Sequence, residues 1–207
     1  MILERLKTGS SKDKILEKSE EALDSGDLIV YPTDTVYGLG ADATSDEAVK
    51  KVYEAKSRPE ENPISVIVDS LSMAEKVASL DDDEKKVIRK MFPGPLTIVS
   101  DSNSYVSDRL TGNTGKIGIR IPGHALVLDL VSRLGRPMTT TSANITGGKT
   151  PRSPEEAIDQ VGDSVEIVID DGELDESDPS TVFEIEDSNV RIIREGPVSK
   201  SAIQEVL

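Results

Sequence analysis

The segment "ATSDEAVKKVYEAKSRPEENPISVIV", residues 43–68, places a helix, a polar turn and a strand in direct succession. Apolar residues recur at helical spacing over 45–57, and Ser45 is a plausible N-cap for that helix. The run "PISVIVDS" at 63–70 has the composition of a buried strand. A helix followed at once by a strand is typical of α/β proteins, so this segment favours that class.

Similar segments continue on both sides of it, and they are separated by glycine, proline and polar residues. Strands are predicted within 27–35, 96–100, 115–122, 137–144, 165–170, 180–186 and 189–195. Helices are predicted within 13–26, 81–92, 125–135, 153–162 and 199–206. We interpret "YGLGADATS" at 37–45 as a loop and "DDGELDESDPS" at 170–180 as a flexible one. This order predicts one α/β domain over 1–207, built on a twisted mixed β-sheet flanked by helices.

The composition excludes several kinds of catalytic group and metal site. The chain has no cysteine and one histidine, His124. Disulfides, thiolate metal sites and cysteine nucleophiles are therefore excluded, and a histidine-dependent triad or zinc site has little to draw on. No apolar run is long enough to span a membrane, and residues 1–14 do not resemble a signal peptide. We expect a cytoplasmic protein with no membrane contact, whose chemistry relies on Lys, Arg, Ser, Thr and Asn.

The net charge of −15 argues at first against a site for anions. The charge is uneven, however, because residues 153–190 hold 14 acidic residues and no Lys or Arg. Residues 1–152 are nearly neutral, with 21 basic and 23 acidic residues. The acidity is thus regional, most simply a solvated surface, and it leaves room for a cationic pocket elsewhere.

Lys56 and Arg58 are the first candidates for such a pocket, since they stand between the helix and the strand of the opening segment. Cations at a helix C-terminus also have a purely structural explanation, because they meet the negative end of the helix dipole. The alternative is that they bind an anion. No P-loop accompanies them, because the Walker order of Gly, Lys and Ser/Thr is absent.

Two further polar segments follow predicted strands. "YPTDTVYGLGADA" at 31–43 carries Thr33, Asp34 and Thr35, which suit either a ligand site or an ordinary turn. "TTTSANITGGKTP" at 139–151 stacks hydroxyls and an amide that can donate to phosphate oxygens or to a base.

Arg120 lies in the alternating strand "GKIGIRIP". An arginine there is often only an outward-facing residue. Gly118 and Gly123 flank it, and we expect them to leave room for a small ligand. His124 is interpreted as a structural or surface residue.

Together these segments resemble the YrdC family of threonylcarbamoyl-AMP synthases. The resemblance runs from about residue 13 to the C-terminus, with its motifs within about 13–197, and its most specific pieces are Lys56-x-Arg58 and Ser142-x-Asn144. The segments that carry it are 31–40, 56–63, 92–99, 117–122, 139–151, 180–185 and 192–196. Some members have a second C-terminal domain, and we expect this chain to be a single-domain member. Ile67 departs from the pattern, because many relatives have a histidine there.

The resemblance implies a concave, positively lined cleft on the sheet. There a nucleotidyltransferase would convert L-threonine, bicarbonate and ATP to threonylcarbamoyl-AMP and pyrophosphate. The product would feed N6-threonylcarbamoyladenosine formation at position 37 of tRNA, through a downstream threonylcarbamoyl transferase machinery. Mg²⁺ would be carried mainly by the ATP phosphates, with no metal site of the protein's own.

The resemblance also implies roles for particular residues. Those expected to contact threonine are Thr35, Arg120, Thr140 and Ser180. Those expected to hold the nucleotide are Lys56, Arg58, Asn62, Ser142, Asn144, Thr150 and Arg194. Lys56 and Arg58 would also be catalytic, because permanent cations offset the repulsion between anions when a carbamate attacks a phosphate.

Two other functions fit parts of the sequence. One is a module that binds tRNA or double-stranded RNA without catalysis, although residues 1–152 lack the basic excess that such a surface needs. The other is the related carbamoyl-adenylate domain of hydrogenase-maturation proteins, which lies in longer chains with metal-binding segments that this sequence lacks.

Overall fold

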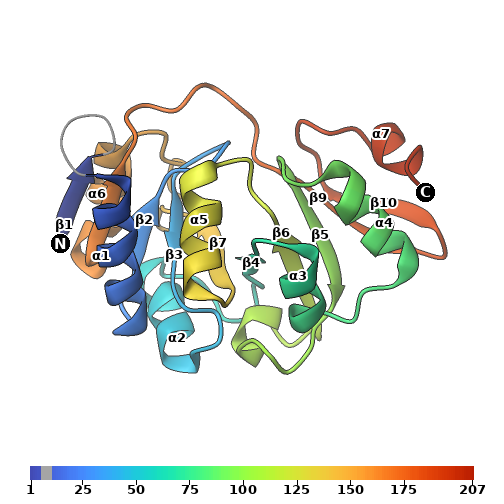
Figure 1. Cartoon of the computed structure of the whole chain (residues 1–207), viewed down its shortest axis with the longest axis horizontal. Helices are drawn as coiled ribbons and strands as arrows, with labels where there is room; N and C mark the ends of the chain where they lie inside the picture. The colour runs from blue at the N-terminus through green and yellow to red at the C-terminus, as the bar shows by residue number, and fades with distance from the viewer. Residues whose placement is uncertain (6–10) are drawn as a thin grey trace.

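The computed structural model describes residues 1–5 and 11–207, and within them the strands form one ten-stranded sheet (Figure 1). Its order is β1-β8-β2-β3-β7-β4-β6-β5-β9-β10, with parallel and antiparallel pairs mixed. The strands are β1 Ile2–Arg5, β2 Ile29–Tyr31, β3 Gly38–Gly40, β4 Ser65–Ile67, β5 Leu96–Asp101, β6 Lys116–Arg120, β7 Met138–Ser142, β8 Ile167–Asp170, β9 Thr181–Glu186 and β10 Asn189–Arg194. The prediction of an α/β fold with a mixed sheet is confirmed.

The helices are α1 Lys12–Asp24, α2 Asp46–Ala55, α3 Leu71–Val77, α4 Asp82–Met91, α5 Ala125–Leu134, α6 Pro154–Val161 and α7 Lys200–Gln204. Their starts follow local chemistry. The Ser45 side chain accepts from the Ala48 N–H at 3.3 Å, which confirms it as the N-cap of α2. Asp81 and Glu84 form a reciprocal capping box that begins α4. None of the described helices is long and apolar enough to cross a membrane.

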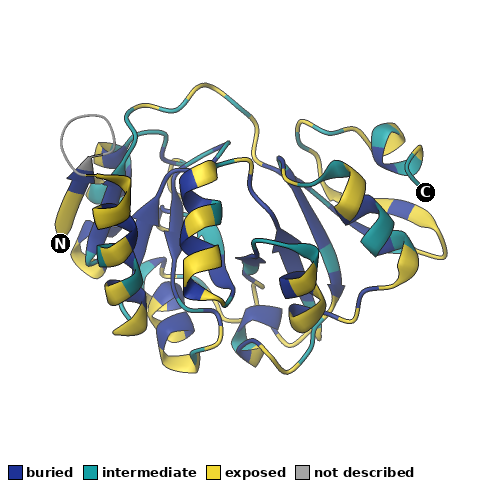
Figure 2. Ribbon diagram, viewed as in Figure 1, coloured by how far each residue is buried: buried dark blue, intermediate teal, exposed yellow. Residues whose placement is uncertain are grey.

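The core lies between the sheet and the helices that pack on it. Figure 2 shows the central strands largely buried, while the end strands β1 and β10, the outer faces of the helices and the loops carry the exposed residues. In α2, Val49 and Val52 are fully buried while Lys50 and Lys51 are exposed, as the helical spacing of the sequence predicts. This packing fixes the end of α2 against the sheet, and Lys56 and Arg58 follow directly.

The interpretation of residues 37–45 as a loop is wrong in part, because Gly38–Gly40 is strand β3. It pairs antiparallel with β2, and Gly38 lies opposite Tyr31. A Cβ on Gly38 would come within 2.7 Å of the Tyr31 ring, and one on Gly40 within 2.8 Å. The two glycines are therefore needed in a strand that passes under a buried aromatic ring, and glycine usually signals a turn.

We expect Gly38→Ala to lower the free energy of unfolding by about 1–3 kcal/mol, because the Tyr31 ring is fully buried and cannot move aside. Chemical denaturation would measure this. Gly94→Ala is the matched control, since the nearest atom to a new Cβ there is at 3.5 Å, an ordinary contact. Equal losses of stability in both variants would contradict the proposed role of the ring.

The connection from β8 to β9 links distant parts of the sheet and contains the acidic segment 171–180. Figure 1 shows it, in orange, passing along the upper edge of the molecule from one half to the other. It has no regular structure, as expected, but it is held by hydrogen bonds. The Leu174 N–H donates to the Arg152 carbonyl at 2.8 Å, and the Ser177 hydroxyl donates to the Thr35 carbonyl at 3.1 Å. It thereby ties the acidic region to the turn after β2.

Candidate functional site

A cavity of about 250 Å³ lies at the middle of the sheet, where segments distant in sequence meet. It is bordered by the turn after β2, the segment between α2 and β4, and residues of β5, β6, β7, β9 and β10. Most of the predicted site residues line it, namely Thr35, Arg58, Arg120, Thr140, Ser142, Thr150, Ser180 and Arg194. Two larger hollows, each of about 450 Å³, contain none of the predicted residues.

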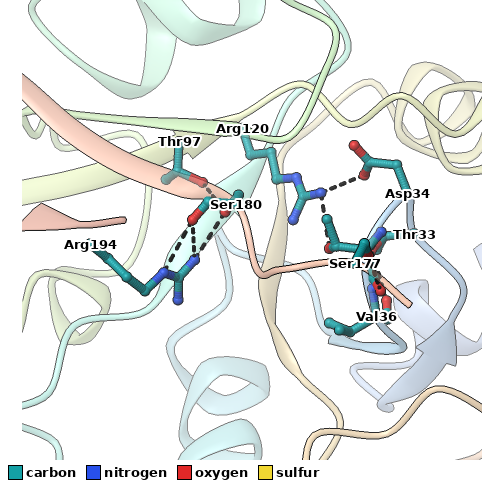
Figure 3. A network of polar contacts seen from close by, with 9 residues as sticks. Thr33, Asp34, Val36, Thr97, Arg120, Ser177, Ser180 and Arg194 are labelled. Atoms are coloured by element: carbon teal, nitrogen blue, oxygen red, sulfur yellow. Dashed lines mark hydrogen bonds and ion pairs between the residues drawn. The ribbon is translucent and has the colours of Figure 1, made fainter. Parts of the chain in front are cut away.

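Arg120 ends β6, and its side chain is only 7% exposed. Its Nη2 donates to Asp34 Oδ1 and also to the Thr35 hydroxyl, which is 3.2 Å away (Figure 3). Arg120 thus points inward to the cavity, and the outward-facing alternative is wrong. A buried guanidinium held on one side by a carboxylate can still offer other N–H groups to an anion.

The glycines beside Arg120 do not both leave space for a ligand. A Cβ on Gly118 would lie 2.2 Å from the Ser65 hydroxyl, because β4 packs closely beside β6 there. Gly118 is therefore needed for strand packing. A Cβ on Gly123 would meet Asp34 Oδ2 at 3.5 Å, an ordinary contact.

Arg194 reaches the same cavity from the end of β10. Its Nε and Nη2 donate to the Ser180 carbonyl at 3.1 and 2.7 Å, and Nη2 also meets the Ser180 hydroxyl at 3.0 Å. That hydroxyl is in turn 3.0 Å from the hydroxyl of Thr97 on β5. Burial lowers the pKa of the Arg194 guanidinium, and the charge of Arg120 lowers it further. Two cations that repel each other across one cavity favour an anion between them.

Lys56 and Arg58 lie at the C-terminus of α2 but do not serve mainly to offset its dipole. Arg58 lines the cavity, where its Nε and Nη2 donate to the carbonyls of Asn62 and Pro63 at 3.2 and 3.0 Å. The Lys56 side chain is buried and donates to the Ser142 carbonyl and, at 2.7 Å, to the Asn144 carbonyl. Burial, aided by the charge of Arg58, lowers the pKa of Lys56 to about 8.

Lys56 therefore lies behind the cavity wall and braces the segment that follows β7. Asn144 is also buried there, and its Nδ2 donates to the carbonyls of Ile145 and Gly148 at 2.9 and 3.0 Å. The Asn62 residue is exposed, and its carbonyl accepts from Arg58 and from the Tyr53 hydroxyl. Of the predicted residues, Lys56, Asn62 and Asn144 are those that the structure places outside the lining.

Some residues in or beside the cavity lining had no particular role assigned to them from the sequence. Thr33 accepts from the Thr35 and Val36 N–H groups, both at 3.1 Å, and so shapes the turn after β2. Ser65 and Thr97 line the cavity but lie in strands whose sequence looks purely structural. Asp34 is not part of the lining but pairs with Arg120, which is 86 positions away, so no local pattern could reveal this pairing.

His124 and Ile67 both lie outside the lining of the cavity. The His124 Nε2 lies 3.5 Å from Asp171 Oδ2, away from the lining of the cavity, in agreement with a structural role. Ile67 is fully buried in β4 and does not line the cavity. Ile67 is a member of the apolar core.

The arrangement is suited to a polyanion beside a small polar molecule. Arg58, Arg120 and Arg194 supply guanidinium groups, of which that of Arg120 is paired with Asp34, and the remaining polar lining is mostly hydroxyl groups from Ser and Thr. Arginine can grip carboxylate or phosphate groups with two parallel hydrogen bonds. Among the described residues the lining offers no nucleophile paired with a general base, so its chemistry is positioning and charge stabilisation.

Comparison with known proteins agrees with this arrangement. The Sua5–YciO–YrdC family model, described as "Telomere recombination", matches residues 21–196. A Methanocaldococcus jannaschii protein provisionally named threonylcarbamoyl-AMP synthase is 38% identical over 193 residues, which cover 92% of this chain and 91% of that protein. The Bacillus subtilis threonylcarbamoyl-AMP synthase is 32% identical over 200 residues, which cover 96% of this chain and 58% of that protein.

A solved structure has a similar fold. Sua5 from Pyrococcus abyssi, complexed with L-threonine, superimposes with a TM-score of 0.93 and 30% identity. The match covers 100% of this chain and 61% of that one. The chain therefore spans about three fifths of the length of some of its relatives.

Proposed function

Because the chain belongs to the Sua5–YciO–YrdC family, we propose that it is an L-threonylcarbamoyladenylate synthase. It would form threonylcarbamoyl-AMP and pyrophosphate from L-threonine, bicarbonate and ATP. The observation that carries the proposal is one cavity in which Arg120 and Arg194 face each other among hydroxyls, with Arg58 in its wall. The relatives named as synthases, and the relative solved with L-threonine, support the same choice over an RNA-binding module.

The residues divide between two substrates. Arg120 and Thr35 would hold the threonine carboxylate, with the hydroxyls of Thr140 and Ser180 near the rest of the molecule. Arg58 and Arg194 would hold the phosphates, with Ser142 and Thr150 adding neutral donors. Lys56, Asn62 and Asn144 lie outside the cavity lining and would contribute by fixing the backbone that carries those donors. A small cavity with fixed groups holds both substrates in one orientation, which is the main source of rate in phosphoryl transfer.

The reaction needs no covalent intermediate with the protein. The threonine amine and bicarbonate condense with loss of water to a carbamate, whose oxygen attacks the α-phosphorus. The bond to the β-phosphate oxygen breaks, and pyrophosphate leaves with that electron pair. Arginines near the phosphates offset the charge that builds up in this step.

Mg²⁺ would enter on the phosphates of ATP. The lining supplies hydroxyls and cations in place of the carboxylates that a resident Mg²⁺ would require. The ion would therefore take its ligands from phosphate oxygens and water, and it would neutralise part of the phosphate charge.

Product analysis tests the proposed function. With ATP, labelled bicarbonate and L-threonine, we expect pyrophosphate and a labelled AMP adduct, and neither should form when threonine or bicarbonate is omitted. The reason is that the carbamate made from both is the attacking group. Formation of ADP and phosphate, or a rate that ignores threonine, would show that the chain has another activity.

Other parts of the assignment remain predictions. They are a role in N6-threonylcarbamoyladenosine formation at tRNA position 37, a cytoplasmic location, transfer of the adenylate to a downstream transferase, and direct contact with tRNA. Adding tRNA and a transferase to the product assay would test the transfer.

A further inference from the structure

The cations around the cavity differ in the groups that balance them. Arg58 donates to the carbonyls of Asn62 and Pro63, and these acceptors are uncharged. The acceptors of Arg194, the carbonyl and hydroxyl of Ser180, are uncharged as well. Arg120 instead forms an ion pair with the carboxylate of Asp34.

Figure 3 shows how these groups lie. Arg120 is between the Arg194–Ser180–Thr97 group on one side and Asp34 on the other. The carboxylate therefore adjoins one of the two facing arginines and not the other. The half of the cavity at Arg194 keeps its positive charge, and the half at Arg120 is nearly neutral.

Asp34 is held firmly in this position. Thr33 on one side of it closes a turn through the Thr35 and Val36 N–H groups, and its own hydroxyl donates to the Val36 carbonyl at 2.7 Å. The backbone of Gly123 packs beside the carboxylate. Its second oxygen, Oδ2, is buried and has no hydrogen-bond partner within residues 1–5 and 11–207. The negative charge is thus balanced by Arg120 and cannot turn away easily.

The fixed charge of Asp34 affects the binding of a monoanion and of a dianion to different extents. Beside this ion pair the attraction of Arg120 and the repulsion of Asp34 largely offset each other, for a monoanion and for a dianion alike. A phosphate dianion therefore gains little there, although it loses more hydration than a carboxylate does on entering the cavity. The side chains are only 7% and 17% exposed, so water screens the interaction weakly. Specificity of this kind comes from a repulsive group set against the wrong ligand.

We propose that Asp34 determines specificity by making the Arg120 subsite accept a carboxylate and reject a phosphate. Resting on the proposed function, this keeps the amino-acid half of the cavity free of inorganic phosphate and pyrophosphate, which the other half must bind. Asp34 acts through Arg120 and takes no part in bond formation.

The test is Asp34→Asn, which keeps the oxygen that accepts from Arg120 and removes the charge. Initial rates are measured at saturating Mg-ATP, with threonine varied against inorganic phosphate at a pH where phosphate is a dianion. We expect the inhibition constant of phosphate against threonine to fall by about 10-fold or more. The KM for threonine should change by less than about 3-fold, since the guanidinium stays in place.

Asp42→Asn is the matched control, because Asp42 accepts from Arg136 Nε at 2.7 Å and does not line the cavity. It should leave phosphate inhibition unchanged. A merely structural role for Asp34 would weaken threonine and phosphate together, so tighter phosphate binding separates the two explanations.

The unaltered protein gives a second test that does not depend on a variant's folding. Acetate should compete with threonine more strongly than phosphate does. The inference is overturned if phosphate competes more strongly than acetate, or if Asp34→Asn leaves phosphate inhibition as it was while threonine still saturates normally. If threonine has no effect on the unaltered protein, the proposed function fails as well.

Discussion

Replacing Arg58 with alanine is expected to lower kcat/KM for ATP by about 10²–10³-fold. The guanidinium lines the cavity, and two neighbouring carbonyls hold it in one orientation. Those two bonds leave other N–H groups of its fork for phosphate oxygens. An oriented, half-buried cation stabilises the charge of the transition state without reorganising, so its loss is expected to lower the rate. Steady-state pyrophosphate release with ATP varied would measure the effect.

The helix before Arg58 supplies matched controls. Lys50 is exposed and lies 3.7 Å from Glu54, and Lys51 is exposed and donates to the Gly26 carbonyl at 2.6 Å. Alanine at either position should change kcat/KM for ATP by less than about 2-fold, because surface ion pairs contribute little. If these variants lost as much activity as Arg58→Ala, the positive charge of the region as a whole would matter, and the cavity would not.

Replacing Arg120 with lysine is expected to raise the KM for threonine by about 100-fold while changing the KM for ATP by less than about 3-fold. Lysine keeps the charge, so Asp34 is not left as an unpaired buried carboxylate. It cannot hold Asp34 and Thr35 and also present a planar fork to the threonine carboxylate. Initial rates with each substrate varied in turn would give both constants.

Arg136→Lys is the corresponding control, because Arg136 pairs with Asp24 and Asp42 at a distance from the cavity lining. Both KM values should stay within about 2-fold of the original in this variant. A parallel rise of the two KM values in Arg120→Lys would instead assign Arg120 to the phosphates. The proposed division of the cavity between two substrates would then be wrong.

Local patterns in the sequence were sufficient to predict most of the elements. The helical spacing and cap of 45–57 predicted α2, because a helix is stabilised by neighbours within one or two turns. Local patterns gave the wrong prediction at β3, where two glycines indicated a loop. The strand is explained only by the Tyr31 ring above it, and Tyr31 comes from another strand. Local patterns also missed β1 and α3.

The candidate site was predictable in its residue types more than in its geometry. The order of the polar segments pointed to Arg58, Arg120 and Arg194, and the structure places all three in the lining of one cavity. The order did not indicate that Lys56 lies behind the wall, where it donates to backbone carbonyls near residue 144. That placement depends on how the end of α2 meets the segment after β7.

The sequence by itself determined the class of fold, the absence of cysteine chemistry and the family resemblance. These depend on local periodicity, on composition and on the order of motifs. Only the tertiary structure decided which charges face each other. Asp34 and Arg120 are brought together by the sheet, which places the turn after β2 near the end of β6. An ion pair between residues so far apart leaves no local signal, because its energy depends on distance and burial and not on sequence spacing.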